Sequence, residues 1–373
     1  AIYITEDRKY LFTDFHHILA DGNSYDIIFE DINRAYMGEK LKKESYTGFD
    51  AALDEEQQMK EGKYKKAEKY YDSIFEGVET ESLPLPDRND EIPERGYLSK
   101  EMDTRESVVL SACEKLGVTP NILFTGLFGV LMTRYSNSED SLFATIYNGR
   151  NDSRLENTVC MLVKTLPVYC ACDPKATIQT YMAELSEQLL SSMANDIFPF
   201  SDICAKYGFS SDLVFAYQAE LSDDYPIGDT IARGHDLSPD MSKMPLLIQV
   251  REYDHKYVLT AEYRSDKYSE EFVKGILDAY EAAMDSMLKA KYISEISILS
   301  GNAADKIAEF NHTAHEYDRS QTISDMFDEM VEIIPDHTAV VFKDRKYTYK
   351  ELDEISDRLG KYIVSQGIGT EDV

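Results

Sequence analysis

Two adjacent histidines near the start of the chain, His16 and His17, are followed by Asp21 and Gly22. Histidine changes its charge near neutral pH and is the side chain that most often acts as a general base. An Asp-Gly pair favours a sharp turn, and we expect a helix to begin within the next two residues. The free N–H groups at the start of a helix create positive potential. A histidine at this place could take a proton from an amine while an N–H group stabilises an oxyanion.

A short hairpin is the element expected to position these histidines. Residues 6–9 are typical of a turn, and residues 11–15 predict a return strand that ends at the histidines. Successive side chains of a strand point to opposite faces, so His16 and His17 should not line the same cavity. One would then pack in the interior while the other faces a cleft. A second interpretation stays open, in which both are hydrogen-bonded core histidines without a chemical role.

Several other kinds of site are absent from the sequence. It contains no Gly-x-Ser-x-Gly elbow, no glycine-rich phosphate loop and no His-Glu-x-x-His motif. The five cysteines are odd in number, and Cys170 and Cys172 would share one face of a strand without a second pair nearby. We therefore expect no metal site and no disulfide framework, but reduced thiols in a cytoplasmic protein.

The charge of the chain limits its partners. A formal net charge of −30 over 373 residues repels the phosphate backbone of nucleic acids and does not favour anionic membranes. No stretch approaches the roughly 20 apolar residues that a membrane span requires. Hydrophobic residues make up 43% of the chain, which is enough for a sizeable core. We expect no nucleic-acid and no membrane partner.

Helical and strand patterns alternate loosely along the rest of the chain. Thr119 and Pro120 predict the start of a helix, and residues 122–135 are apolar on nearly every side, which predicts that this helix is buried. Residues 55–76 are strongly charged with a thin apolar stripe, and we expect the charged residues among 55–70 to form the solvent-facing side of a helix. The alternation predicts an α/β fold, or an α+β fold of layered sheets.

Shifts in composition predict five segments. These are a first lobe (residues 1–80), a proline-containing acidic linker (81–95), a second lobe (96–292), a second linker (293–320) and the opening of a further domain (321–373). The hairpin at the start has no other strand to join, so we expect the first lobe to be incomplete at its N-terminus.

Residues 16–22 match the HHxxxDG motif of condensation domains in nonribosomal peptide synthetases, and residues 156–167 resemble the "ENMVGMFVNTLP" segment of that family. Further segments resemble the family in the same order: Ile146–Arg150, Phe198–Phe200, Val214–Gln218 and Tyr263–Asp266. Downstream, Phe310–Thr313 resembles the linker that follows such domains, and Pro335–Val340 and Tyr347–Leu352 resemble the opening of adenylation domains.

This resemblance implies a chloramphenicol-acetyltransferase-like fold of two lobes in a V, with the first lobe incomplete here. It also implies amide formation between a donor acyl or peptidyl thioester and an acceptor aminoacyl thioester. Both substrates would be carried on the 4′-phosphopantetheine arms of an upstream donor and a downstream acceptor carrier protein, so that no cofactor is bound directly. An adjacent adenylation domain would be a further partner, although the part present lacks a phosphate-binding loop.

The resemblance also assigns roles at the site. His17 is implied as the catalytic histidine, acting as a base or by steering the amine, and the Gly22 N–H as an oxyanion donor. His16 is expected to pack, and Asp21 to be a buried ionic partner whose arginine would lie upstream of residue 1. Three residues are expected along the tunnel between the lobes, namely Ser24, Asn148 and Arg150. For the last two, a capped strand end is an equal alternative.

Departures from the family pattern and competing functions remain. Cys160 stands where the family has Gly, Lys164 where it has Asn, and Asn195 where His is common. Without the upstream part, the chain alone could be inactive. The alternatives are a non-catalytic platform that docks carrier proteins, and an epimerisation-type domain; the adenylation-like segment disfavours the latter and also a free-standing CoA acyltransferase.

Overall fold

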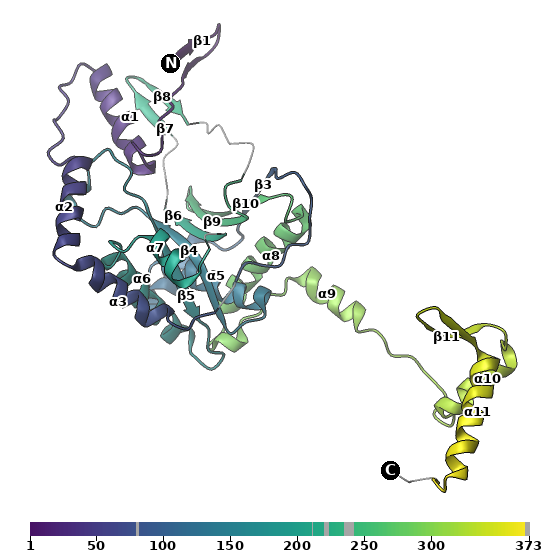
Figure 1. Cartoon of the computed structure of the whole chain (residues 1–373). Helices are drawn as coiled ribbons and strands as arrows, with labels where there is room; N and C mark the ends of the chain where they lie inside the picture. Colours follow the sequence, from purple (N-terminus) through teal and green to yellow (C-terminus); the bar gives the residue numbers. More distant parts are fainter. Residues whose placement is uncertain (80–81, 211, 220–223, 235–241, 370–373) are drawn as a thin grey trace. The chain divides into compact units, whose positions relative to one another are not determined.

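The computed structural model describes residues 1–79, 82–210, 212–219, 224–234 and 242–369. The chain divides into two compact units, Ala1–Ala304 and Asp305–Val373 (Figure 1). The expected linker at 81–95 lies inside the first unit, and the boundary between the units falls within the expected linker at 293–320.

The first unit combines helices with short and long strands. In chain order its elements are β1 (Ile2–Ile4), β2 (Lys9–Leu11), α1 (Gly22–Tyr36), α2 (Gly48–Lys60), α3 (Lys63–Phe75), β3 (Arg95–Glu101), α4 (Glu106–Leu116), α5 (Pro120–Ser136), β4 (Asp140–Tyr147), the 3₁₀ turn Ser153–Leu155, β5 (Lys164–Ala171), α6 (Ile178–Ala194), α7 (Phe200–Tyr207), β6 (Leu213–Gln218), β7 (Asp224–Ile227), β8 (Thr230–Arg233), β9 (Leu246–Tyr253), β10 (Lys256–Arg264), α8 (Glu270–Met287), the 3₁₀ turn Ile293–Glu295 and α9 (Gly301–Phe310), which crosses into the second unit.

A six-stranded mixed sheet forms the centre of this unit. Its strand order is β3-β10-β9-β6-β4-β5. The pairs β9/β6 and β6/β4 are parallel, and the pairs at both edges are antiparallel. The layered mixed fold expected from the sequence is thereby confirmed.

The main core lies between this sheet and α5, with α6 and α8 beside it (Figure 1). Thr119 caps α5 by accepting a hydrogen bond from the Ile122 N–H, and every residue from 122 to 133 is buried. The predicted start and burial of this helix are confirmed. Phe128 stacks on Phe215 of β6 with ring centroids 4.7 Å apart, which ties the helix to the centre of the sheet.

A second, smaller core lies on the other face of β4 and β5. Ala67, Tyr71 and Phe75 of α3 are buried against Phe198 and Ile203 near α7. Leu142 of β4 and Tyr169 of β5 pack there, whereas their neighbours Phe143 and Val168 face the main core. Residues 55–76 therefore form two helices rather than one, with a break at Gly62 (φ 87°), and α3 buries its apolar stripe.

The N-terminal hairpin is shorter than expected. β2 ends at Leu11, so the strand expected over residues 11–15 is wrong, and all residues of β1 and β2 are exposed. Two strands alone offer too few pairings to hold a longer extended segment. The helix that follows, α1, packs against the β7–β8 hairpin, where Phe29 stacks on Tyr225 with centroids 4.3 Å apart.

The second unit contains the end of α9, then α10 (Ile323–Ile333), β11 (Thr338–Phe342), β12 (Arg345–Thr348) and α11 (Tyr349–Ser365). β11 and β12 pair antiparallel, and Phe327 of α10 lies beside Tyr349. Neither α10 nor α11 contains a buried residue.

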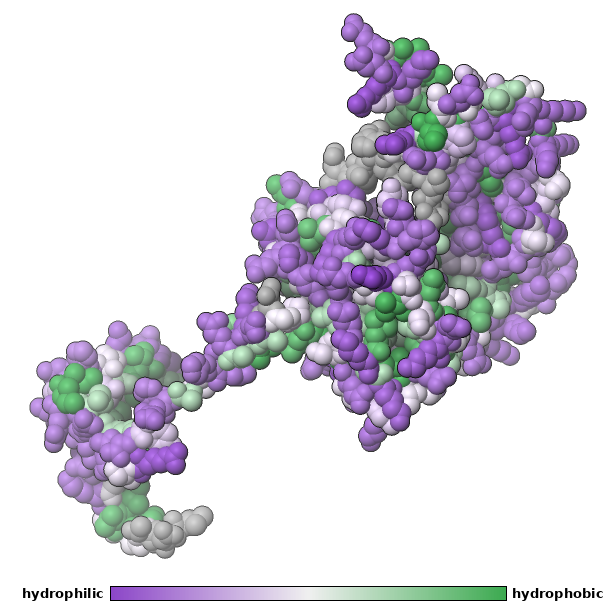
Figure 2. Space-filling view, turned by 180° about the vertical axis from the view of Figure 1, so that it is seen from behind, coloured by the Kyte–Doolittle hydropathy of each residue, from purple (hydrophilic) through white to green (hydrophobic). Residues whose placement is uncertain are grey.

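On the face seen in Figure 2 the surface of the chain is mostly hydrophilic, with hydrophobic residues gathered in a few patches. In the part of the chain that the structure describes, no single helix is long and apolar enough to cross a membrane. Only α4 and α5 together reach that length and composition, and they are bent by 89° at the break between them.

Candidate active site

His17 lies in a turn between the hairpin and α1. Residues 17–19 turn back so that the Leu19 N–H donates to the His16 carbonyl oxygen at 2.8 Å. His17 Nδ1 lies 2.9 Å from the carbonyl oxygen of Ala20. Because a carbonyl oxygen can only accept, Nδ1 carries the hydrogen and Nε2 of the neutral ring keeps its lone pair. The His17 side chain is exposed, so this Nε2 can accept a proton from an incoming group.

His16 does not pack in the interior, so that expectation is wrong. The residue is exposed, and its Nδ1 accepts a hydrogen bond from the Ile18 N–H at 3.2 Å. The reason is the turn, which replaces the strand whose alternation would have sent one of the two rings inward. Gly22 is the first residue of α1 and is exposed; a Cβ there would meet no atom within 4 Å. Its N–H belongs to the first helical turn, whose donors have no intrahelical acceptor.

Asp21 is buried directly behind this turn and caps α1. Its Oδ1 accepts from the Ser24 N–H at 2.9 Å and lies 2.7 Å from Ser24 Oγ. Its Oδ2 accepts from the Leu162 N–H at 3.0 Å. Burial by itself raises the pKa of Asp21, but the hydrogen bonds from Arg150, Ser24 and the Leu162 N–H outweigh it, so the pKa lies below its ordinary value. The carboxylate is therefore ionised and fully partnered.

Arg150 supplies the positive charge that this carboxylate requires. Its Nη1 lies 2.9 Å from Asp21 Oδ2 and its Nη2 lies 3.2 Å from Oδ1, a two-pronged pair. The side chains of Asp21 and Arg150 are 0% and 6% exposed. The expectation that the arginine lies upstream of residue 1 is wrong, and so is the expectation that Arg150 lines a tunnel, because the ion pair holds its guanidinium inside the protein.

Asn148 and Ser24 are the other two residues that were expected to line the tunnel. Asn148 is exposed, and its Oδ1 accepts from the Arg150 N–H at 3.1 Å, which fits the alternative of a capped strand end. Ser24 is fully buried, so its expected place on a tunnel wall is wrong. Its hydroxyl is enclosed between Asp21 and the backbone of Cys160, whose carbonyl oxygen lies 3.0 Å away.

The loop of residues 156–162 completes the site; the sequence marked it as part of a family segment but did not indicate its contacts with Asp21 and Arg150. Its backbone bonds to Asp21 through the Leu162 N–H and to Arg150 through the Thr158 carbonyl oxygen, 3.0 Å from Nη2. Backbone groups take part here irrespective of the side chains, so residue types alone could not reveal them. Gly149 fixes the approach of this loop, because it has φ 67° and packs so tightly on Leu162 that a Cβ would overlap the Leu162 carbonyl oxygen.

A second charged cluster lies at the start of β5. Asp196 accepts a hydrogen bond from the Tyr147 hydroxyl, and its Oδ1 lies 3.2 Å from Lys164 Nζ. Lys164 also lies 3.5 Å from Glu55 of α2. Burial, and then the negative charge of Glu55, raise the pKa of Asp196 to about 6. Lys164 thus stands between two carboxylates and links α2 to the central sheet.

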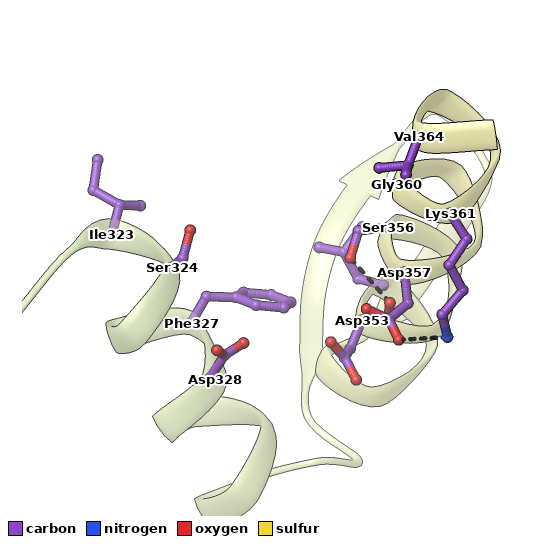
Figure 3. A pocket seen from close by; sticks show the side chains of 11 residues that line it. Ile323, Ser324, Phe327, Asp328, Asp353, Ser356, Asp357, Gly360, Lys361 and Val364 are labelled. Carbon is purple, nitrogen blue, oxygen red and sulfur yellow. Dashed lines mark hydrogen bonds and ion pairs between the residues drawn. The ribbon is translucent and has the colours of Figure 1, made fainter. Parts of the chain in front are cut away.

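A groove lies between α10 and α11 in the second unit. Phe327 points from α10 toward α11 across it, and polar groups of α11 at its rim bond to each other (Figure 3). Lys361 pairs with Asp357 at 3.3 Å, and Ser356 Oγ donates to the Asp353 carbonyl oxygen. Among the described residues, no cluster of three His, Cys, Asp or Glu side chains could hold a metal ion.

Comparison with known protein families decides the identity of the first unit. The family model of the condensation domain matches residues 1–308. The chain belongs to the condensation-domain family. The resemblance to condensation domains and the expected mixed α/β fold are thereby confirmed. The general function of this family is amide bond formation in nonribosomal peptide synthesis.

Curated relatives of this condensation domain are large synthetases. The chain is 26% identical to surfactin synthase subunit 1 of Bacillus subtilis (strain 168), over 98% of the chain and 11% of the relative. It is 24% identical to gramicidin S synthase 2 of Brevibacillus brevis, over 98% of the chain and 9% of the relative. The chain thus spans about a tenth of the length of these relatives.

Solved structures share the fold. The first condensation domain of the calcium-dependent antibiotic synthetase, in complex with a substrate analogue, aligns with a TM-score of 0.62 at 16% identity, over 76% of this chain and 66% of that one. A four-domain nonribosomal peptide synthetase bound to AMP and glycine aligns with a TM-score of 0.65 at 16% identity, over 96% of this chain and 29% of that one.

Proposed function

We propose that this condensation domain joins a donor acyl or peptidyl thioester to the amine of an acceptor aminoacyl thioester. Both would be held on 4′-phosphopantetheine arms of carrier proteins. The amine attacks the thioester carbonyl, the carbonyl oxygen becomes an oxyanion, and its collapse releases the donor arm as a thiol. The amide forms on the acceptor arm, and the proton lost by the amine is taken up by the departing sulfur.

The observation that carries this proposal is the state of the His17 ring. The bond from Nδ1 to the Ala20 carbonyl leaves Nε2 as an acceptor on an exposed ring beside the first turn of α1. An acceptor at that position can receive the amine proton or orient the amine. The N–H of Gly22 is our candidate for stabilising the oxyanion. Asp21 and Arg150 serve the reaction by holding the turn in place.

The partners and setting follow from the same proposal. The donor and acceptor carriers would belong to the same synthetase system, since the relatives are synthetases many times longer than this chain. The second unit would be the opening of an adenylation domain, which its resemblance in sequence supports. All five cysteines are free thiols, which supports a reducing, cytoplasmic setting.

The direct test supplies the protein with a donor carrier and an acceptor carrier, each loaded with its thioester, and detects the amide by mass spectrometry. The same assay is run on the longest polypeptide of its source that contains this chain. We expect product only when both carriers are loaded. Product from a free amine and an acyl-CoA, with no carriers present, would show a stand-alone acyltransferase instead.

A non-catalytic platform that docks carrier proteins is the second candidate. It is favoured by the exposed apolar side chains of β1 and β2, which offer a surface for contact with a partner protein. Replacing His17 by Ala distinguishes the two functions. Loss of a general base should lower kcat by roughly 10²- to 10⁴-fold while folding and carrier binding are retained. Unchanged turnover in the His17→Ala protein would favour the platform.

A further inference from the structure

The 156–162 loop is attached to the histidine turn from one side. Ser24 Oγ lies 3.0 Å from the Cys160 carbonyl oxygen and 3.3 Å from the Cys160 nitrogen, so a single hydroxyl bridges both backbone groups of that residue. The Leu162 N–H donates to Asp21. Any shift of this loop is therefore transmitted to the residue that caps α1.

Residues 44–48, which lead into α2 and include its first residue, hold the same loop from the opposite side. Glu44 Oε1 accepts from the Val159 N–H at 3.0 Å, and the Thr158 hydroxyl donates to the Tyr46 carbonyl oxygen at 2.7 Å. Gly48 lies against Cys160, since a Cβ at position 48 would stand 2.6 Å from Cys160 Sγ. A side chain at residue 48 would therefore force Cys160, the residue found in place of the family's glycine, to move.

Thr158 is the point at which these two attachments meet. Its hydroxyl binds Tyr46, while its carbonyl oxygen accepts from Arg150 Nη2 at 3.0 Å. The residue is fully buried, so neither group can bond to water instead. The segment that residues 156–167 resemble has methionine at this place, and methionine has no hydroxyl to donate. The bond to Tyr46 is accordingly a feature of this chain and not of the motif.

We propose that Thr158 is a positioning residue, which holds the Arg150 guanidinium against Asp21 and so fixes the turn that carries His17. The inference rests on the proposed amide-forming function, because its effect on rate acts through His17. With the hydroxyl in place, the Thr158 carbonyl points at Arg150 from a fixed position. Without it, the carbonyl can rotate away, and the guanidinium loses one of the bonds that orient it.

A second contact secures residues 44–48 from outside. The guanidinium of Arg154 lies 4.3 Å from the ring centroid of Tyr46, and its Nη2 lies 2.9 Å from Asp54, which also accepts the Tyr46 hydroxyl at 2.6 Å. Arg154 is exposed, so its removal leaves no cavity or buried charge. Replacing Arg154 therefore perturbs the same loop without preventing the protein from folding.

The test compares Thr158→Val with Thr158→Ser in the condensation assay. Valine keeps the shape and removes the hydroxyl, whereas serine keeps the hydroxyl. We expect kcat to fall roughly 10- to 100-fold in Thr158→Val, with KM for both carriers changed less than about twofold, because a misplaced group loses rate rather than binding. Thr158→Ser should recover most of kcat. Equal losses in both variants, or a loss confined to KM, would overturn the proposal.

A measurement without turnover separates this inference from the proposed function. Thr158→Val, Asp21→Asn and the double variant are unfolded in urea, and we expect the two shifts in midpoint to be non-additive because the residues share Arg150. Additive shifts would overturn the coupling even if the wild type is active. If Thr158→Val does not fold, Arg154→Ala should lower kcat in the same direction by a smaller factor; an unchanged kcat would count against the proposal.

Discussion

Asp21 and Arg150 show how a single buried charge organises the turn that precedes α1. An ionised carboxylate with no exposed surface is tolerated only when its oxygens are bonded and its charge is paired. Here the guanidinium, the helix start and the 156–162 loop all supply donors. Each donor comes from a different part of the chain, so one carboxylate fixes the relative position of three segments.

Replacing Asp21 by Asn should therefore destabilise the protein severely. The change leaves the Arg150 guanidinium buried without its counter-charge, and breaking such a pair costs about 3–5 kcal/mol. Urea denaturation followed by circular dichroism measures the free energy of unfolding. Asp50→Asn, at an exposed carboxylate in the capping box of α2, is the control and should lower the free energy of unfolding far less, because no charge is left buried. Similar losses in the two variants would contradict this account.

The free energy of unfolding should depend on pH through Asp21 and Asp196, and the two carboxylates should act in opposite directions. The pKa of Asp21 is lowered in the folded state, so its contribution is present above its unfolded pKa and is lost as the pH falls below about 4. The pKa of Asp196 is raised to about 6, so its contribution is present below about pH 4 and is lost as the pH rises toward 6.

The urea midpoint measured between pH 4 and pH 7 tests the second of these. In Asp196→Asn the decline in stability that Asp196 causes between pH 4 and 6 should disappear. Glu55→Gln should weaken the same decline, since Glu55 is the second cause of the raised pKa. A profile for Asp196→Asn that runs parallel to the wild type across this range would refute the assignment.

Residue types alone could predict which side chains gather at the site but not their orientation. The spacing of His17, Asp21 and Gly22 identified the turn and the helix start. The outward direction of His16 and the burial of Ser24 depend on a turn and on a loop more than a hundred residues away. The sequence did not reveal Arg150 as the partner of Asp21. Arg150 follows the end of a strand, and a capped strand end accounts for an arginine there equally well.

Helices and strands that depend on their own residues were predicted correctly from the sequence. Those that depend on contacts with distant parts of the chain were not. α5 follows from its Thr-Pro start and its apolar sequence, which are local properties. The strand expected over residues 11–15 required a neighbouring strand, and β2 stops at Leu11 because only β1 pairs with it among the described residues. The apolar stripe expected within residues 55–76 is buried on α3, but its packing partners near residue 200 could not be predicted from the sequence.

The tight connection after β4 should be sensitive to a change at Gly149. Gly149→Ala should destabilise the protein by more than about 2 kcal/mol, because the residue has positive φ and its Cβ would overlap backbone at Leu162. Gly208→Ala is the matched control: φ is 76° and no atom lies within 4 Å, so only the backbone cost of about 1 kcal/mol applies. Thermal unfolding compares them, and equal effects would show that the overlap relaxes freely.

For the molecule as a whole, burial is concentrated in the first unit. Both hydrophobic cores of the described residues lie before residue 305, whereas α10 and α11 contain no buried residue. A unit of this size with so little buried apolar surface has marginal stability. The charge of −30 adds self-repulsion at low ionic strength.

Hydrogen exchange should reveal this difference directly. We expect amides of α10 and α11 to exchange by local opening, at least about 10²-fold faster than those of α5, which should exchange only through global unfolding. Peptide-level mass spectrometry on the intact chain resolves the helices in one experiment. Comparable protection in α10 and α5 would show that the second unit is stabilised as strongly as the first.

The smaller core determines where the chain can be recombined with a related synthetase. Tyr71 and Phe75 of α3 pack against Phe198, so a crossover placed in the proline-containing stretch at 81–95 would pair a helix from one parent with a surface from another. A junction at the boundary after Ala304 divides neither core among the described residues. Chimeric enzymes joined there should inherit both hydrophobic cores intact, and only α9 would combine residues of two parents.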